Sequence, residues 1–299
     1  MKLFFTHLGH FAWQQMLSCL FPILLFLTFA VTKAVTVPGL HRYDLILLVC
    51  LVAQLLLYKT GLETKDELKV IAVFHLAGLC LELFKTHLHS WAYPEAGWTK
   101  LYGVPLYSGF MYASVASYLC QAWRRLDVDL TGWPPAWAAW ALCGGIYVNF
   151  FTEHWLPDTR WALAALILLL FRRTQARFTV CATPYALPMP VAFLLLGFFL
   201  WIAENIATFF GAWQYPNQHG GWHLVHLAKM SSWSLLVIFS FLIVAQLKRV
   251  KQGLERNAGR DSAAARWSMS EKWAGWARRG QSRRYRDAPD GASQARENP

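Results

Sequence analysis

The sequence predicts an all-α polytopic membrane protein, a bundle of about eight transmembrane helices followed by a disordered basic tail. Of its 299 residues, 56% are hydrophobic and 16% aromatic, and the mean hydropathy is +0.29, values that soluble domains rarely reach. A helix that crosses a hydrocarbon core of about 30 Å needs roughly 17 to 25 apolar residues. Runs near that length lie at Gln15–Thr32, Tyr43–Tyr58, Leu68–Phe84, Val104–Trp123, Pro135–Phe151, Pro157–Phe171, Pro188–Phe209 and Trp222–Leu247.

The sixth run is the weakest of the eight. Its uninterrupted apolar part is only Trp161–Phe171, and it must include Asp158 and Arg160 to reach a spanning length. A re-entrant hairpin is the alternative for this segment.

The basic residues that flank the runs predict the orientation, because short loops rich in Lys and Arg stay in the cytoplasm. An even number of spans then places both termini in the cytoplasm. No cleavable signal peptide is recognisable in the first apolar run. The predicted cytoplasmic side carries Lys2, Lys59, Lys65, Lys69, Arg124, Arg125, Arg172, Arg173 and Arg177, whereas the other side carries only Lys33, Arg42, Lys85, Lys100 and Arg160.

The chain divides by composition into a transmembrane domain, residues 1–248, and a cytoplasmic tail, residues 249–299. From Lys248 onward there are thirteen Lys and Arg against six acids, with too few apolar residues to fold alone. Trp267, Trp273 and Trp276 among basic residues suit contact with anionic lipid headgroups. A plain positive-inside anchor is the alternative, and nucleic acid is not expected as a partner.

Six cysteines are scattered among the apolar runs with no CxxC pair, which excludes a sequence-evident disulfide framework or thiolate metal site. No Walker loop, dinucleotide glycine fingerprint, nucleophile elbow or HExxH motif occurs.

On the predicted topology, titratable residues gather at the extracytoplasmic ends of the helices. The most distinctive run is His219 to Lys229, where offsets of three and four residues place His219, His223, His226 and Lys229 near one helical stripe. Gly220 and Gly221 allow the alternative that His219 precedes the helix. The same membrane face carries Glu82, Lys85, His87, His89, Glu153, His154, Glu204 and Asn205.

This residue set predicts a metal-dependent site. Imidazoles are common ligands of zinc and other transition metals, and His87, His89, His154, His219, His223 and His226 are the ligand candidates. Glu82, Glu153 and Glu204 are candidates for base or ligand-orienting carboxylate. Three alternatives stay open: an aromatic-belt role for His87 and His89, an ion pair for Lys229 or Lys85, and helix-to-helix contact for Glu204 and Asn205.

Four runs carry a resemblance to a known family: Phe84 to Trp91, Asn149 to His154, Glu204 to Thr208, and His219 to Lys229. Through them the chain resembles the YoaT-type bacterial membrane proteins, a family with a domain of unknown function, over nearly everything up to Lys248. The resemblance implies a multi-spanning protein of the bacterial inner membrane and no particular activity. A looser similarity is to the ceramidase and progestin-receptor type of seven-helix membrane hydrolases, through the HxxxH spacing of His219 and His223. Their Ser and Asp-His set is missing here.

The leading functional hypothesis is a membrane-embedded, metal-dependent hydrolase that acts on a lipid or another amphiphile near the extracytoplasmic face. The alternatives are a transporter or proton-coupled carrier that uses the same His, Glu and Lys residues, and a haem or retinal binder.

Overall fold

The computed structural model describes residues 2–152, 155, 159–227 and 229–249. By contact density the chain separates into two units, Met1–Gln246 and Leu247–Pro299, and the following account concerns the first. The predicted tail beyond Arg249 lies outside the described residues, so its disorder and its lipid contacts stay predictions.

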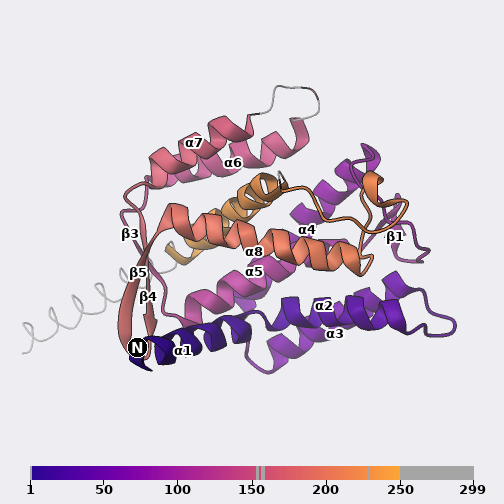
Figure 1. Cartoon of the computed structure of the whole chain (residues 1–299), viewed down its shortest axis with the longest axis horizontal. Coiled ribbons are helices and arrows are strands. Elements are labelled where there is room, and N and C mark those ends of the chain that lie inside the picture. The colour runs from indigo at the N-terminus through magenta and orange to yellow at the C-terminus, as the bar shows by residue number, and fades with distance from the viewer. Residues whose placement is uncertain (1, 153–154, 156–158, 228, 250–299) are drawn as a thin grey trace, which may run out of the picture. The chain divides into compact units, whose positions relative to one another are not determined.

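The described residues are mostly helical (Figure 1), which confirms the helical part of the predicted fold class. Short strands and a 3-10 turn, η1, connect the helices. The helices are α1 (Lys2–Ser18), α2 (Leu20–Ala34), α3 (Arg42–Lys59), α4 (Lys65–His87), α5 (Ser108–Arg125), α6 (Ala136–Thr152), α7 (Arg160–Phe171), α8 (Met189–Phe209) and a last helix, Lys229–Arg249. The remaining elements are β1 (Lys100–Leu101), β2 (Val104–Pro105), β3 (Asp129–Thr131), β4 (Gln175–Val180), β5 (Thr183–Pro188) and η1 (Pro216–Gln218).

Fewer helices than the predicted eight have the length and composition of a membrane span. Among the described residues two qualify, Met189–Phe209 and Lys229–Arg249. A third span results if α1 and α2, which are bent by 67° at Cys19, are one broken segment. The prediction of eight spans is therefore not supported. The count of eight included two segments that do not qualify. Helix α7 has only 12 residues and extends about 18 Å at 1.5 Å per residue, and α4 has charged residues at both ends.

Local sequence explains where several helices begin. Thr64 and Glu67 form a capping box, in which each side chain bonds the other residue's backbone N–H and satisfies the free donors of the first turn of α4. Helix α8 begins directly after Pro188 and carries Pro190 in its first turn, where the missing proline N–H leaves no hydrogen bond unmade.

The loop after α7 forms the hairpin β4–β5, which pairs with β3 from the loop after α5 in a three-stranded antiparallel sheet that the sequence analysis did not predict. Strand β4 lies between β3 and β5, with Leu130 opposite Ala176 and Phe178 opposite Tyr185. Cys181 and Ala182 form the β4–β5 turn with φ values of 49° and 60°, the left-handed geometry of a two-residue hairpin. Part of the predicted basic loop is thus a hairpin.

Close helix contacts are made at glycines. A Cβ atom at Gly78 of α4 would lie 2.3 Å from the Tyr112 ring of α5, and one at Gly197 of α8 would overlap the Ser234 hydroxyl of the last helix. Small residues at such crossings let helix backbones approach closely. In Figure 1, α8 runs between the α6–α7 pair and the α2–α3 pair.

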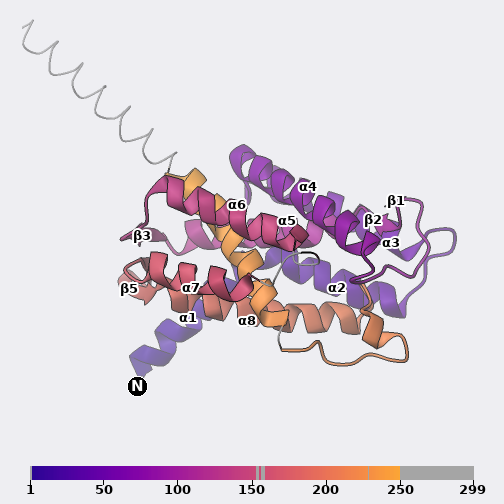
Figure 2. The ribbon, with the colours of Figure 1, turned by 90° about the horizontal axis from the view of Figure 1, so that it is seen from above.

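The two ends of the helical bundle differ. Figures 1 and 2 both place β3, β4 and β5 at one end, beside α1, and β1 and β2 at the other. His7 and Phe11 of α1 contact Tyr185 and Phe178 of the hairpin. The end with β1 and β2 holds the functional candidates.

Candidate functional site at the β1–β2 end

The loop after α4 and the loop after α8 are joined by a single antiparallel bridge. Ala92 N–H donates to the Gln214 carbonyl at 2.9 Å, and Gln214 N–H donates to the Ala92 carbonyl at 3.0 Å. The bridge places the histidines at the end of α4 beside the segment that carries His219.

A pocket of about 970 Å³ opens at this junction. Its wall combines imidazole, aromatic, amide and apolar side chains from the two loops and the end of α4. It carries no Asp, Glu, Lys or Arg side chain among the residues that line it. The lining is Leu83, Thr86, His87, His89, Trp91, Ala92, Tyr102, Gln214, Pro216 and His219.

Three of the six predicted metal-ligand histidines therefore border one pocket. His87 is the last residue of α4, and His89 follows with a φ of 55°, which turns the chain out of the helix. His219 directly follows η1. All three rings are exposed. Thr86 also lines the pocket, and its buried hydroxyl oxygen has no hydrogen-bond partner among the described residues.

Glu82 lies behind the pocket wall and accepts three hydrogen bonds. Trp91 Nε1 and the Tyr93 hydroxyl each donate at 2.7 Å, and the Tyr112 hydroxyl donates at 2.8 Å. Only 3% of Glu82 is exposed, and three donors offset much of the cost of burying a carboxylate. Trp91 connects Glu82 to the pocket, because its ring also lines the pocket.

Glu204 of α8 forms a second buried carboxylate site. The Tyr215 hydroxyl and Trp233 Nε1 each donate to one of its oxygens. The Lys229 ammonium lies 5.1 Å from the centre of the Tyr215 ring and is close enough to Glu204 for electrostatic attraction. The Trp91 and Tyr215 rings meet edge to face at 6.1 Å, so the two carboxylate sites share a boundary.

The predicted helical stripe from His219 to Lys229 is wrong. Residues 222–226 have no regular secondary structure, and the described helix begins at Lys229. His223 and His226 are exposed and do not line the pocket. The glycine pair Gly220–Gly221 follows His219 after η1, with Gly221 at a φ of 143° that other residues rarely adopt. The alternative that His219 lies outside the helix was the correct one.

Asn205 holds this irregular segment, residues 222–226, against α8. Its side-chain oxygen accepts the Val225 N–H at 2.8 Å, while Trp201 Nε1 donates to the Val225 carbonyl at 3.1 Å. Trp222 Nε1 donates to the Thr208 hydroxyl at 3.1 Å. Asn205 therefore links a helix to a loop, whereas the sequence favoured a link between two helices.

The remaining predicted site residues are not brought to the pocket. Lys85 is 3% exposed on α4 and lies outside the pocket lining. Glu153 and His154 lie outside the described residues. Within the described ranges, no three His, Cys, Asp or Glu side chains are arranged to hold a metal ion. The described part of the chain also gives no feature that favours haem or retinal binding.

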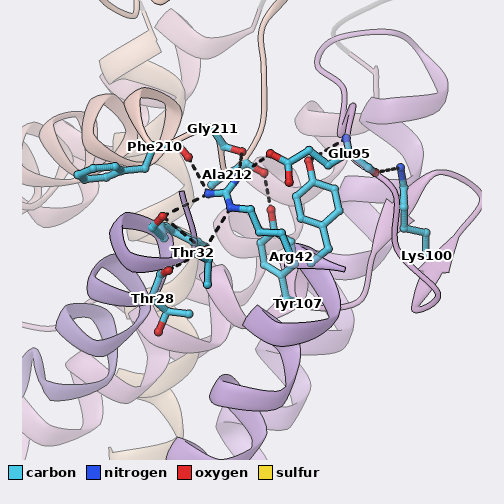
Figure 3. A network of polar contacts seen from close by, with 11 residues as sticks. Thr28, Thr32, Arg42, Glu95, Lys100, Tyr107, Phe210, Gly211 and Ala212 are labelled. Carbon is cyan, nitrogen blue, oxygen red and sulfur yellow. Dashed lines mark hydrogen bonds and ion pairs between the residues drawn. The ribbon is translucent and has the colours of Figure 1, made fainter. Parts of the chain in front are cut away.

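Sequence reasoning missed the residue that organises this end of the bundle, Arg42. Figure 3 shows its guanidinium between the ends of α2 and α8 and the loop before β1. It donates to Glu95 Oε1 at 2.7 Å, to Thr32 Oγ1 at 3.1 Å, and to three carbonyls, those of Phe210 at 2.6 Å, Gly211 at 3.0 Å and Phe29 at 3.3 Å. A cation in the first turn of a helix opposes the helix dipole, and that anomaly was the available signal.

Asp44 and Lys100 fix the loop that Arg42 anchors. Asp44 accepts the backbone N–H groups of Trp98 and Thr99, both at 2.9 Å. Lys100 Nζ donates to the carbonyls of Tyr93 at 2.8 Å and Glu95 at 3.0 Å. Burial lowers the pKa of the Lys100 ammonium, an effect that the nearby Glu95 carboxylate opposes. The loop behind the pocket is therefore held at several points.

Comparison with known proteins agrees with the predicted family. Residues 7–241 match the family described as "Protein of unknown function (DUF817)". The chain is 57% identical to "Uncharacterized protein YoaT" of Bacillus subtilis (strain 168) over 254 residues, which cover 85% of this chain and 96% of that protein. No solved structure matches. These comparisons show no similarity to the ceramidase and progestin-receptor type. The chain belongs to the DUF817 family of proteins of unknown function.

Proposed function

We propose that this protein is a multi-pass protein of the bacterial inner membrane with both termini in the cytoplasm. Apolar side chains are turned outward on several helices. On α3, Leu48, Leu51 and Leu55 are each about half exposed, and on α8 Phe199 is 63% exposed. In water such faces would favour aggregation, whereas in lipid they have no cost. The lipid bilayer is the partner that fits them.

We propose further that the pocket at the β1–β2 end is the substrate site of a membrane-embedded hydrolase for a lipid or another amphiphile. The observation that carries this proposal is the convergence of His87, His89 and His219 on one pocket that also has aromatic and apolar walls. Imidazoles supply general acid and base chemistry near neutral pH. Aromatic and apolar walls suit the boundary between a headgroup and its chain.

The proposal does not require a metal, but the pocket histidines could also bind a transition metal such as zinc. The exposed histidine rings can supply imidazole ligands, and a bound metal would supply an activated water. Thr86 and Gln214, which also line the pocket, would orient the substrate by hydrogen bonds.

The test compares pocket histidines with a matched histidine outside the pocket. Purified protein is assayed against a panel of ester and amide amphiphiles, with metal content measured in parallel. His87→Ala and His219→Ala should each lower turnover by about 10²-fold or more, as expected for loss of acid–base catalysis. His223→Ala should leave turnover unchanged. Equal effects of all three substitutions, or no turnover of any substrate by the wild type, would refute the proposal.

A proton-coupled carrier is the second candidate, because Glu82 is buried with neutral hydrogen-bond donors only. Buried acids of this kind are typical of proton relays in membrane proteins. In proteoliposomes, solute uptake should collapse a pH gradient in the wild type and not in Glu82→Gln. Uptake that leaves the gradient intact would exclude this candidate.

A further inference from the structure

The site around Glu204 has the chemistry of a receptor for an organic cation. Glu204 is 2% exposed, and both its oxygens already accept aromatic donors, Tyr215 and Trp233. Burial raises the pKa of the Tyr215 hydroxyl well above its usual range, with the Glu204 carboxylate adding to the shift. Tyr215 therefore stays a hydrogen-bond donor to the carboxylate. A carboxylate flanked by aromatic rings is an arrangement that attracts ammonium groups.

The protein itself places an ammonium group there. Lys229 Nζ lies 5.1 Å from the centre of the Tyr215 ring, and its charge acts on Glu204. Lys229 is in the first turn of the last described helix, where the helix dipole disfavours a cation. Lys229 is also partly exposed to solvent. The Lys229 ammonium is therefore attracted by the Glu204 site and disfavoured by the dipole of its own helix. Another ammonium group could replace it.

The site also borders the pocket. Tyr215 lies between Gln214 and Pro216, both of which line the pocket. The Tyr215 ring contacts the ring of Trp91, another lining residue, at 6.1 Å. A molecule in the pocket is thus separated from the Glu204 site by these two rings.

We propose that Glu204, Tyr215 and Trp233 form a recognition site for a primary ammonium group, which Lys229 occupies until the amine headgroup of a pocket ligand replaces it. The proposal rests on the proposed function for the pocket and names the class of its ligand, an amine-bearing amphiphile. Exchange requires movement of the Lys229 side chain and of the Trp91 and Tyr215 rings that separate the pocket from the site, with no covalent bond made or broken.

Chemical rescue tests this site directly. Lys229→Met removes the tethered cation and should lower the melting temperature of the purified full-length protein by about 2 to 4 °C, the shift for roughly 1 kcal/mol in a protein of this size. Methylammonium chloride should restore most of that loss in a saturable way. Sodium chloride and tetramethylammonium chloride at equal ionic strength should not. If the Lys229→Met variant does not fold, the same rescue experiment is done with Lys229→Gln, which has a side chain of similar length and no charge.

Two controls separate the site from general salt effects. The double variant Glu204→Gln with Lys229→Met should show no response to methylammonium. Lys69→Met, at an exposed surface pair with Asp66, should show neither the loss nor the rescue. Equal stabilisation by sodium, or rescue that persists without Glu204, would overturn the proposal.

The outcome is independent of the assay for the pocket. Rescue of Lys229→Met with no effect of the His87 and His219 substitutions would keep the ammonium site and reject the hydrolase. The reverse pattern would keep the pocket function and reject the ammonium site.

Discussion

At the scale of single residues, the most heavily bonded side chain at the pocket end is Arg42. It satisfies the carbonyls of Phe210 and Gly211, which α8 leaves free at its C-terminal end, and it also reaches the Phe29 carbonyl within α2. The planar guanidinium reaches these acceptors and Glu95 together because its donors point in several directions. A lysine has the charge without that geometry.

Arg42→Lys should therefore destabilise the protein although the charge is kept. Loss of one or two hydrogen bonds to a charged group costs about 1.5–3 kcal/mol each, and Arg42→Met should cost more. Thermal unfolding in detergent would measure the difference. Lys69→Met, which breaks the exposed Lys69–Asp66 pair, should change stability by less than about 0.5 kcal/mol. Equal shifts for the two sites would contradict the role assigned to Arg42.

Glu63 makes stability depend on pH. This loop residue is 1% exposed and accepts hydrogen bonds from Gln54 and Ser117. Burial raises its pKa above the ordinary value of 4.5, and Glu67 adds to the shift while Ser117, Gln54 and Arg124 oppose it. The folded protein thus holds this proton more tightly than the unfolded chain, so the stabilising contribution is complete below the ordinary pKa. It is lost as pH rises through the raised pKa.

Glu63→Gln should remove this pH dependence. The melting temperature of the variant, relative to the wild type, should rise as pH increases from about 4.5 upward, because the neutral amide has no charge to bury. Melting curves across that range measure it, and Asp66→Asn on the exposed start of α4 is the control. A difference that does not change with pH would show that Glu63 ionises freely in the folded protein.

At the scale of elements, the segment between α8 and the last helix depends on α8 for its position. Val225 is buried and bonded from both sides by Trp201 and Asn205, while the residues around it are exposed. The segment is therefore fixed at one central point.

Asn205→Leu should loosen this segment and leave the helices intact. Removing the acceptor of the Val225 N–H should speed amide hydrogen exchange at residues 222–227 by about 10-fold, which corresponds to loss of roughly 1.4 kcal/mol of local protection. Mass spectrometry of peptic fragments would follow it. Asn217→Ala, an exposed residue of η1, provides the matched control. Unchanged exchange would mean that Trp201 and Trp222 suffice to hold the segment.

Helix positions were more predictable than the connections between them. The run Pro188–Phe209 predicted α8 (Met189–Phe209) within one residue, and Tyr43–Tyr58 predicted α3 (Arg42–Lys59) equally well, because apolar length is a local property. The β4–β5 hairpin has no comparable signal, since its burial does not alternate cleanly along the strands. The sequence analysis grouped His87, His89 and His219 because it placed them at the same membrane face. The helical stripe from His219 to Lys229 was wrong because Gly220 and Gly221 interrupt the helix that its spacing predicted.

At the scale of the whole molecule, the proposed membrane orientation can be tested with two thiols. Cys181 is exposed in the β4–β5 turn, and Tyr102 is 91% exposed between β1 and β2. Strand β5 and the strands β1 and β2 lie at opposite ends of the described helices (Figure 2), so the two turns that carry these residues lie at opposite ends as well. The basic residues Arg172, Arg173 and Arg177 predict a cytoplasmic β4–β5 turn.

A membrane-impermeant maleimide applied to intact spheroplasts should label Tyr102→Cys in a background that retains Cys181 as the only other cysteine. Cys181 should react only after the membrane is opened. A separate variant retains Cys80, exposed on α4, as its only cysteine. If this face of α4 contacts lipid, Cys80 should stay unlabelled in both intact and opened spheroplasts. Labelling of Cys181 in intact spheroplasts would reverse the orientation.

The bridge between Ala92 and Gln214 determines when the pocket can form during synthesis and folding. Its two hydrogen bonds join residues more than a hundred positions apart in the chain, and contacts of such separation carry a large loop-closure entropy and form late in folding. During synthesis His87 and His89 leave the ribosome with α4 long before Gln214 and His219 do. A partly synthesised chain therefore has helices and no pocket, and the pocket belongs only to the finished protein.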